Sequence, residues 1–298
     1  MKLSFRHLRR VLCALFFCFS SAAALAIDQA HALVESVQMP AWLERNGVRQ
    51  PLEPGRALRN RDRLITGNDA RVMVRLAEGS AVKLGENAQL ELNALGRREN
   101  HVFTAALDVA RGAFRFTTGV FSNLRQKRAV NVRIATITAG IRGTDLWGRA
   151  DAERDLICLL EGHITIFHAL DEARELTEPL SFYAAAKDSA PQAIDQVDAE
   201  QVAKWSAETE VQPGSGYARR HGKWKIDLAT LDEAAAALDL YDRARAAGYA
   251  VRIRPKATAT GFSYTLRVSQ LASKVDAEVL AARLIGVLGL SDPVVTAY

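Results

Sequence analysis

Short runs of alternating apolar and polar residues, separated by turn residues, constrain the fold of this chain more than any other feature. The clearest run is ARVMVRLAEGSAVKLGENAQLELN, residues 70–93. Val72, Val74 and Leu76 alternate there with other side chains, and Glu-Gly-Ser and Gly-Glu-Asn turns separate three such segments. A period of two places successive side chains on opposite faces of a strand. Strands at this spacing predict an all-β sandwich or roll over residues 33–180.

Later runs keep the alternation but interrupt it with glycine. LDVARGAFRFTT and DLICLLEGHITIFHA each contain one glycine at the break. In VNVRIATITAGIRGTDLWGRA, residues 130–150, the apolar positions change phase between Ile134 and Ala135. A strand cannot switch faces without an extra residue, so we predict a bulge or break at that point.

The triplet Arg142-Gly143-Thr144 follows this change of phase. Glycine permits a sharp bend, and Asp145 is close enough in sequence to accept hydrogen bonds from Arg142 or from the amides of the turn. No cysteine, histidine or general base stands beside the triplet. We interpret it as a structural corner held by Arg142, and a contact with a ligand or partner is the alternative.

A basic segment and an apolar run open the chain. Lys2 and three arginines precede VLCALFFCFSSAAALA, residues 11–26, which is shorter than the roughly 20 residues of a membrane span. This pattern predicts a signal peptide over residues 1–26, cleaved there or after Ala32, and a periplasmic protein without a stable membrane span in its mature form. An uncleaved anchor is the alternative. Removing those four charges lowers the formal net charge from +5 to +1, which argues against nucleic acid as a partner.

The last third of the chain follows a different pattern. Helical periodicity at residues 198–210 and a Pro-Gly-Ser-Gly segment predict a helix and linker over residues 181–222. KWKIDLATL, YAVRIRPKA, FSYTLRVSQL and DPVVTAY are typical of strands. Two helical segments lie among them, one ending at Gly248 and one capped by Ser273. The order βαββαβ predicts an α+β, ferredoxin-like domain over residues 223–298.

Motifs for catalysis, metals and cofactors are missing from the sequence. It has no GxSxG, HExxH or CxxC motif and no P-loop, so we expect no enzyme and no cofactor. Outside the predicted signal peptide the single cysteine is Cys158, in an apolar run typical of a buried strand. His163 and His168 are five residues apart and would point to opposite faces of a strand, so no metal site is expected.

The first part of the chain resembles the FecR-domain family. The resemblance spans about Val34 to His168 and is carried by the hairpin-rich stretch LEPGRALRNRDRLITGNDARVMVRLAEGSAVKLGENAQLEL, the Arg-Gly-Thr motif and the closing CLLEGHITIF. Founding members are transmembrane regulators that pass an outer-membrane signal to a cytoplasmic sigma factor. Ten residues precede the apolar run here, so the sigma-regulator role is not expected. The resemblance implies an interaction domain that binds an envelope protein.

The C-terminal part, about Lys223 to Tyr298, resembles the SPOR (sporulation-related) domain. That family binds peptidoglycan glycan strands stripped of their stem peptides. Members usually begin with an apolar-Gln-apolar-Gly-Ser-Phe strand, whereas this chain reads Ile-Asp-Leu-Ala-Thr-Leu at residues 226–231. The family's later Gly-Pro-Phe is replaced by Ser-Gln-Leu at residues 269–271.

Period-two alternation in the C-terminal strands defines a candidate binding face. One phase faces the helices, and the other exposes polar side chains weighted toward arginine. The candidate glycan-binding residues are Lys225, Asp227, Arg252, Arg254, Thr265 and Arg267. An ordinary solvated sheet face is the alternative, whereas an RNA-binding sheet would need exposed aromatics on this face.

The preferred hypothesis is a non-enzymatic periplasmic envelope protein that binds denuded peptidoglycan glycan through its C-terminal domain. The alternative is a signalling sensor of FecR type that docks an outer-membrane or envelope partner. A cell-wall hydrolase is disfavoured because the sequence has no acid and base constellation for it.

Overall fold

The computed structural model describes residues 30–98, 101–119, 128–187, 189–192 and 194–298. The predicted signal peptide, residues 1–26, lies outside the described residues. Ala32, after which the second predicted cleavage would occur, is the first residue of strand β1 and is completely buried. Cleavage after residue 26 therefore leaves β1 whole.

Residues 32–186 form strands and no helix within the described part of the chain, as the alternation predicts. The turns after Leu76 and Leu84 also fall where the sequence places them. The strands of this half, together with β15 beyond it, are β1 Ala32–Gln38, β2 Ala41–Arg45, β3 Val48–Pro51, β4 Ala57–Leu58, β5 Asp62–Thr66, β6 Arg71–Leu76, β7 Ala81–Leu84, β8 Gln89–Arg97, β9 Phe103–Thr117, β10 Arg128–Ile134, β11 Ile137–Ala150, β12 Arg154–Phe167, β13 Arg174–Leu176, β14 Ser181–Ala186 and β15 Asp195–Gln196.

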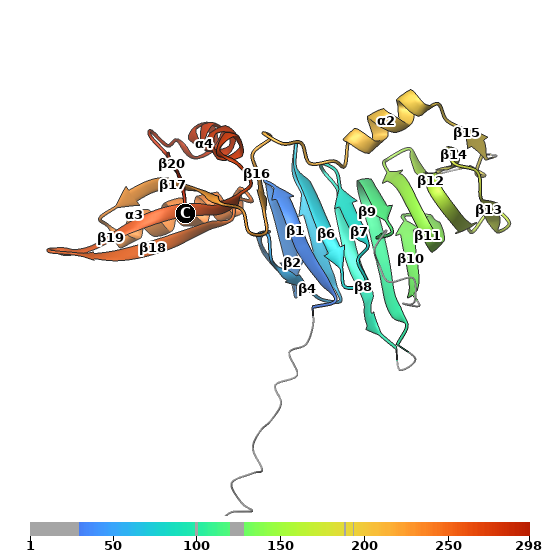
Figure 1. The fold of residues 1–298 in the computed structure, drawn as a ribbon, viewed down its shortest axis with the longest axis horizontal. Helices are drawn as coiled ribbons and strands as arrows, with labels where there is room; N and C mark the ends of the chain where they lie inside the picture. Colours follow the sequence, from blue (N-terminus) through green and yellow to red (C-terminus); the bar gives the residue numbers. More distant parts are fainter. Residues whose placement is uncertain (1–29, 99–100, 120–127, 188, 193) are drawn as a thin grey trace, which may run out of the picture.

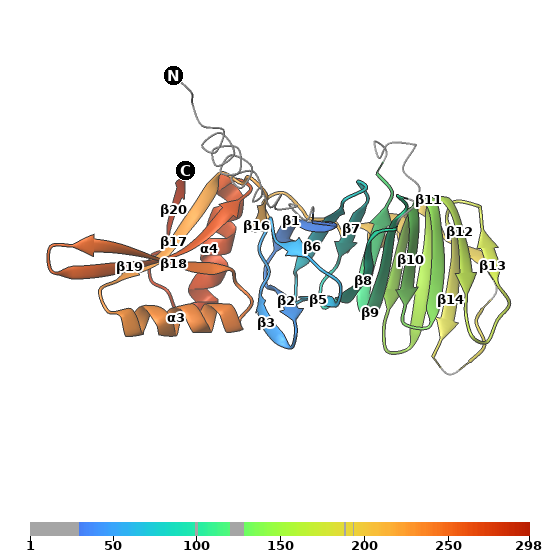
Figure 2. The ribbon, with the colours of Figure 1, turned by 90° about the horizontal axis from the view of Figure 1, so that it is seen from below.

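Three long strands, β9, β11 and β12, take part in two layers of pairing (Figures 1 and 2). In one layer their segments join the series β1-β6-β7-β9-β11-β12-β14. In the other layer they join β3-β2-β5-β8-β9-β10-β11-β12-β13. The single parallel pairing described is β10 with β9. Because these strands bend from one layer into the other, their inward side chains contribute to one continuous core.

Glycines mark the bends. Gly112, Gly143 and Gly162 all have positive φ, at 84°, 67° and 92°. The pairing of β11 with β12 shifts register between Arg142 and Asp145, directly opposite Gly162. The glycine breaks seen in the sequence are therefore corners, because only glycine adopts this backbone conformation without strain.

The phase change after Ile134 has a simpler origin than the predicted bulge. Ile134 pairs with Ile137, so Ala135 and Thr136 form a two-residue turn between β10 and β11. Ala135 has a φ of 43°, in the left-handed region that such hairpin turns require. The predicted break is real, and it is a hairpin.

Helix α2, Ala199–Ala207, crosses the outer side of the layer that contains β11 and β12 (Figure 1). Asp198 caps its first turn by accepting a hydrogen bond from the Gln201 amide. Trp205 stacks on Trp147 of β11 with ring centroids 4.6 Å apart and planes 3° from parallel. Glu208, just beyond the helix, pairs with Arg149. The helix is thus fastened to the first half.

The C-terminal module follows the order β-α-β-β-α-β. Its elements are β17 Trp224–Leu231, α3 Ala234–Ala246, β18 Val251–Thr258, β19 Gly261–Leu271, α4 Lys274–Leu288 and β20 Val294–Ala297. The strands pair antiparallel in the spatial order β20-β17-β19-β18. Ser273 caps α4, and Gly248 with positive φ follows α3, both as the sequence predicts.

Both helices cover one face of this sheet (Figure 2). Ala237, Leu240 and Ala244 of α3 and Leu280 and Leu284 of α4 are buried in the core with the apolar phase of the strands. The strand residues in this core include Ile226, Leu228, Leu266 and Val268. No helix among the described residues covers the opposite face of the sheet.

The predicted linker is packed against both halves. Strand β16, Tyr217–Arg219, pairs with β1 and also with β19, so the sheets of the two halves are joined edge to edge (Figure 1). Asp276 of α4 accepts hydrogen bonds from the amides of Gly214 and Gly216 at 2.9 and 3.1 Å. The Ala41 amide donates to the Gly248 carbonyl at 3.2 Å. These contacts hold the C-terminal module in a defined orientation.

Candidate functional site

The uncovered face of the C-terminal sheet carries the six residues predicted as glycan ligands. Asp227, Arg267 and Arg252 face one another across β17, β19 and β18, and Thr265 lies opposite Arg254. Lys225 is opposite Thr296 of β20. The neighbours of the other phase are apolar and face the core: Ile226, Leu228, Val251, Leu266 and Val268 are buried and Ile253 is half-buried. Alternation along each strand therefore places the six on the same, opposite side.

Not every cation on this face is available. The Arg267 guanidinium donates to both carboxylate oxygens of Asp227, with one N–O distance of 2.9 Å. This hydrogen bonding raises the pKa of Arg267 and keeps its charge paired. The Lys225 ammonium lies 5.0 Å from the centre of the Tyr298 ring. Thr265 shares a hydrogen bond of 3.0 Å with Thr230.

Arg252 is also paired, with a residue from the first half of the chain. Its guanidinium donates to the Glu53 carboxylate at 2.7 Å. Arg254 is different. It is exposed, and within the described part of the chain no ion pair or hydrogen bond engages its side chain. Arg254 is therefore the arginine of the face that a ligand reaches without displacing an internal partner.

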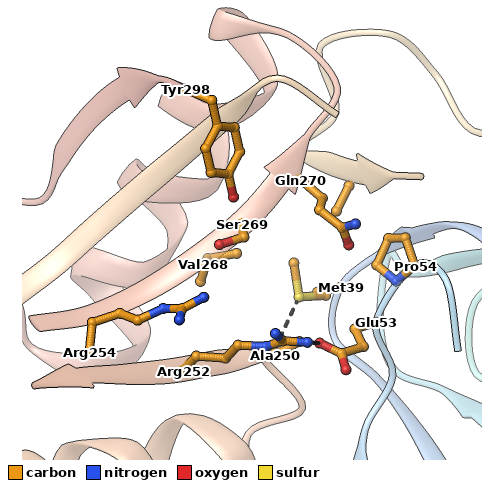
Figure 3. Close-up of a pocket in the computed structure, with 11 residues that line it drawn as sticks. Met39, Glu53, Pro54, Ala250, Arg252, Arg254, Val268, Ser269, Gln270 and Tyr298 are labelled. Carbon is orange, nitrogen blue, oxygen red and sulfur yellow. Dashed lines mark hydrogen bonds and ion pairs between the residues drawn. The ribbon is translucent and has the colours of Figure 1, made fainter. Parts of the chain in front are cut away.

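A pocket of about 190 Å³ adjoins this face where the two halves meet (Figure 3). Arg252, Arg254, Ser269, Gln270 and Tyr298 line it from the C-terminal module. Met39, Glu53 and Pro54 line it from the first half. In Figure 3 the Tyr298 ring lies across the pocket from Arg252 and Glu53, with Ser269 between them. Hydroxyl, amide, guanidinium and carboxylate groups thus surround a space about the size of one sugar ring.

Sequence reasoning missed most of this pocket. Ser269 continues the phase of Thr265 and Arg267, so extending the alternation by two residues would have found it. Gln270 has a φ of 65°, a local feature that the sequence does not reveal. Glu53 is separated from Arg252 by 199 positions, and its role depends on how the halves pack.

The expectation that Arg142 holds the Arg142-Gly143-Thr144 corner is wrong. Arg142 is exposed, and its side chain makes no hydrogen bond or ion pair with the described residues. Thr144 is buried, and its amide donates to the Thr118 hydroxyl at 3.0 Å, while its own hydroxyl donates to the His163 carbonyl at 2.8 Å. The corner is held by Thr144 and by two facing glycines, Gly143 and Gly162.

Asp145 does not serve the corner in the predicted way either. Its carboxylate accepts from Arg115 at 2.7 and 2.9 Å and from the Thr117 hydroxyl at 3.2 Å. The Arg115 guanidinium in turn pairs with Glu210 beyond α2. Asp145 therefore links β11 to β9 and to the end of the α2 segment.

Other candidate groups form no second site. In the described ranges no group of three or more histidine, cysteine, aspartate or glutamate side chains is placed to hold a metal ion. Cys158 is buried, as predicted, and burial raises the pKa of its thiol to about 12. Within the described residues no helix is long and apolar enough to cross a membrane.

Comparison with protein families identifies both parts of the molecule. The family described as FecR protein matches residues 62–165, and the SPOR domain family matches residues 221–296. The chain joins a FecR domain to a SPOR domain. Both are envelope-associated binding or signalling domains, and the SPOR family is associated with peptidoglycan binding. The open sheet face and most of the pocket lining belong to the residues matched to the SPOR family. Met39, Glu53 and Pro54, which supply one wall, precede the residues matched to the FecR family.

Two crystal structures, at 1.65 and 2.50 Å, of a candidate anti-sigma factor from Parabacteroides distasonis are also similar. The first has 10% sequence identity and a TM-score of 0.40, and the match covers 67% of this chain and 96% of that chain. The second has 13% identity and a TM-score of 0.39, covering 75% and 90%. No curated protein matches the chain.

Proposed function

We propose that this protein is a non-enzymatic periplasmic envelope protein that binds denuded peptidoglycan glycan through the open face of its SPOR module. In this organisation residues 1–26 direct export, residues 33–180 form the FecR-like domain, and residues 223–298 form a ferredoxin-like SPOR module. The basic and apolar N-terminal pattern and the envelope association of both families support the periplasmic location.

One observation carries the proposal. Within the residues matched to the SPOR family, an uncovered sheet face presents the free Arg254 beside a polar pocket. Removing the stem peptide from a glycan strand leaves a free carboxylate on each lactyl group, next to hydroxyls and acetamides. A guanidinium binds a carboxylate through paired hydrogen bonds, and serine, glutamine and tyrosine side chains suit the neutral groups.

The pairing pattern refines which cations act. Arg254 and Lys225 supply charge that no carboxylate in the described chain neutralises, whereas Arg267 mainly holds Asp227. A carboxylate of the glycan would first meet Arg254. The six predicted ligands are therefore unequal, and Arg254 is expected to contribute most.

Co-sedimentation with purified sacculi tests this function. The mature chain is expected to pellet with sacculi, and more strongly after an amidase has removed the stem peptides. Arg254→Ala should weaken binding about tenfold, because a charged hydrogen bond contributes about 1.5 kcal/mol or more. Lys274→Ala is the matched control, since Lys274 has the same charge but belongs to α4, on the helical side of the sheet. A wild-type chain that stays in the supernatant with stripped sacculi would refute the proposal.

The FecR-like domain supports a second role within the same protein. Its family is associated with signalling, and this half presents its own folded surface next to the SPOR module. We propose that it docks an envelope protein, which makes a FecR-type sensor the alternative function. Capture of one defined envelope protein by the FecR-like half, abolished by substitutions on that half and unaffected by Arg254→Ala, would support it.

A further inference from the structure

Glu53 reaches from the FecR-like domain onto the candidate glycan site. It lies between β3 and β4, and its carboxylate accepts from the Arg252 guanidinium at 2.7 Å. Figure 3 shows this pair at one side of the pocket, and Arg254, on the same strand as Arg252, also lines it. The domain that is not expected to bind glycan therefore places a carboxylate where a glycan carboxylate would bind.

Backbone contacts fix both partners, so the pair is not a chance encounter of two flexible side chains. On one side, the Leu52 amide donates to the Ala41 carbonyl at 2.8 Å and the Gly55 amide to the Val34 carbonyl at 2.8 Å. On the other side, the Ala250 amide donates to the Met39 sulfur at 3.4 Å, two residues before Arg252. The loop and the strand are thus held next to each other before the side chains pair.

We propose that the interdomain pocket is a subsite for an acidic sugar residue, and that Glu53 is a built-in competitor which the ligand must displace from Arg252. This inference rests on the proposed function and adds to it. The FecR-like domain sets the affinity of the SPOR module, because the ligand carboxylate and Glu53 compete for the same guanidinium. A sugar with a free carboxylate binds Arg252 only when the Glu53 side chain has moved away from it.

The exposure of the pair makes this exchange accessible. The side chains of Arg252 and Glu53 are 57% and 31% exposed, so water solvates both and the pair is only modestly stable. A bound carboxylate that contacts Arg254 as well as Arg252 would outcompete it. A partner that draws the Glu53 loop away from the sheet would raise the affinity for glycan. By linkage, bound glycan would raise the affinity for that partner by the same factor.

A second ion pair between the halves provides the matched control. Arg283 of α4 pairs with Asp69 of the first half at 3.3 Å. Neither residue lines the pocket. Asp69→Asn therefore removes a negative charge and an interdomain ion pair, as Glu53→Gln does, without altering the proposed subsite. If Glu53 only tethered the halves, the two substitutions would have similar effects.

The test is a binding titration of the full mature chain with glycan strands released from amidase-treated sacculi. Glu53→Gln is expected to bind about two- to fivefold more tightly than wild type, the range that loss of an exposed ion pair gives. Asp69→Asn should bind like wild type. Glu53→Gln combined with Arg252→Ala should bind like Arg252→Ala alone, because the competitor acts through that arginine. Thermal unfolding checks that each variant is folded.

Each outcome bears on the proposal. The proposal that Glu53 is a competitor is supported if Glu53→Gln binds glycan more tightly than wild type, or if this variant binds and wild type does not. Wild-type binding that Glu53→Gln leaves unchanged or weakens overturns the competitor and leaves the proposed function standing. An equal gain with Asp69→Asn also overturns it, since a general loosening of the interface would then explain the result. If neither wild type nor Glu53→Gln binds, the subsite and the proposed function both fall.

Discussion

Replacing Gly162 by alanine tests the corner of the FecR-like domain. Gly162 has a φ of 92°, and a Cβ atom added to it would lie 2.1 Å from the Gly143 carbonyl oxygen. The same atom would be 3.0 Å from the Thr144 Cα. Both neighbours are backbone of the facing strand β11, so no side-chain rotation relieves the overlap. The strands themselves must separate.

Two costs add in this variant. Left-handed backbone costs a non-glycine residue about 1–2 kcal/mol. Moving β11 away from β12 also breaks or lengthens hydrogen bonds beside the corner, at about 1 kcal/mol each. Thr144 donates one such bond to the His163 carbonyl, next to Gly162. We therefore expect Gly162→Ala to lower the free energy of unfolding by about 2–3 kcal/mol, which is more than the backbone strain alone.

Gly143→Ala is the matched control, because the two glycines face each other with different surroundings. Gly143 has a φ of 67°, but a Cβ atom added to it would have no neighbouring atom within 4 Å. This variant carries the backbone strain alone, so the expected loss is about 1–2 kcal/mol. Urea unfolding followed by tryptophan fluorescence measures both, since Trp147 in β11 stacks on Trp205 in the native state. Equal losses for the two variants would refute this explanation of the corner.

Three further predictions address the binding face, the junction and the core. Asp227→Asn should free Arg267 and tighten binding to stripped sacculi about two- to fivefold in co-sedimentation, whereas weaker binding would show that Asp227 helps the ligand. Gly248→Ala should loosen the junction and expose it to limited proteolysis, because its Cβ would lie 2.6 Å from an indole ring of β2, while Gly289→Ala, with open space around it, should not. Cys158 should resist alkylation at pH 8 in the native protein and react once urea unfolds it, since burial raises its thiol pKa to about 12. Rapid alkylation of the native thiol would contradict that burial.

Much of the fold was predictable because local rules govern it. Alternation and turn residues indicate the strands of the first half, and the caps at Ser273 and Gly248 indicate the ends of the C-terminal helices. The glycine breaks were visible too. Their structural role was not visible, because Gly143 and Gly162 face each other only through a particular pairing and register of their strands. The same limitation led to the wrong role for Arg142, whose side chain takes no part in the contacts that hold the corner.

The position of the candidate face could be predicted from the sequence, but the availability of its charged side chains could be predicted only in part. Period two places Arg252, Arg254 and Arg267 together, but it cannot say which of them already has a partner. The Asp227 pair lies between neighbouring strands whose register was unknown. The Glu53 pair requires two domains to be packed against each other, which no local pattern encodes. Long-range packing therefore divides these three arginines into two that are paired and one, Arg254, that has no partner among the described residues.

Mapping of backbone amide chemical shifts tests the central claim most directly. The mature chain would be titrated with short glycan strands whose lactyl carboxylates are free. Glycan binding at the open sheet face predicts shifts on β18 and β19 around Arg252, Arg254 and Arg267 and at the Glu53 loop, with α3 and α4 unchanged. Shifts confined to the helical side or to strands far from the pocket, or no shifts at all, would contradict glycan binding at this face.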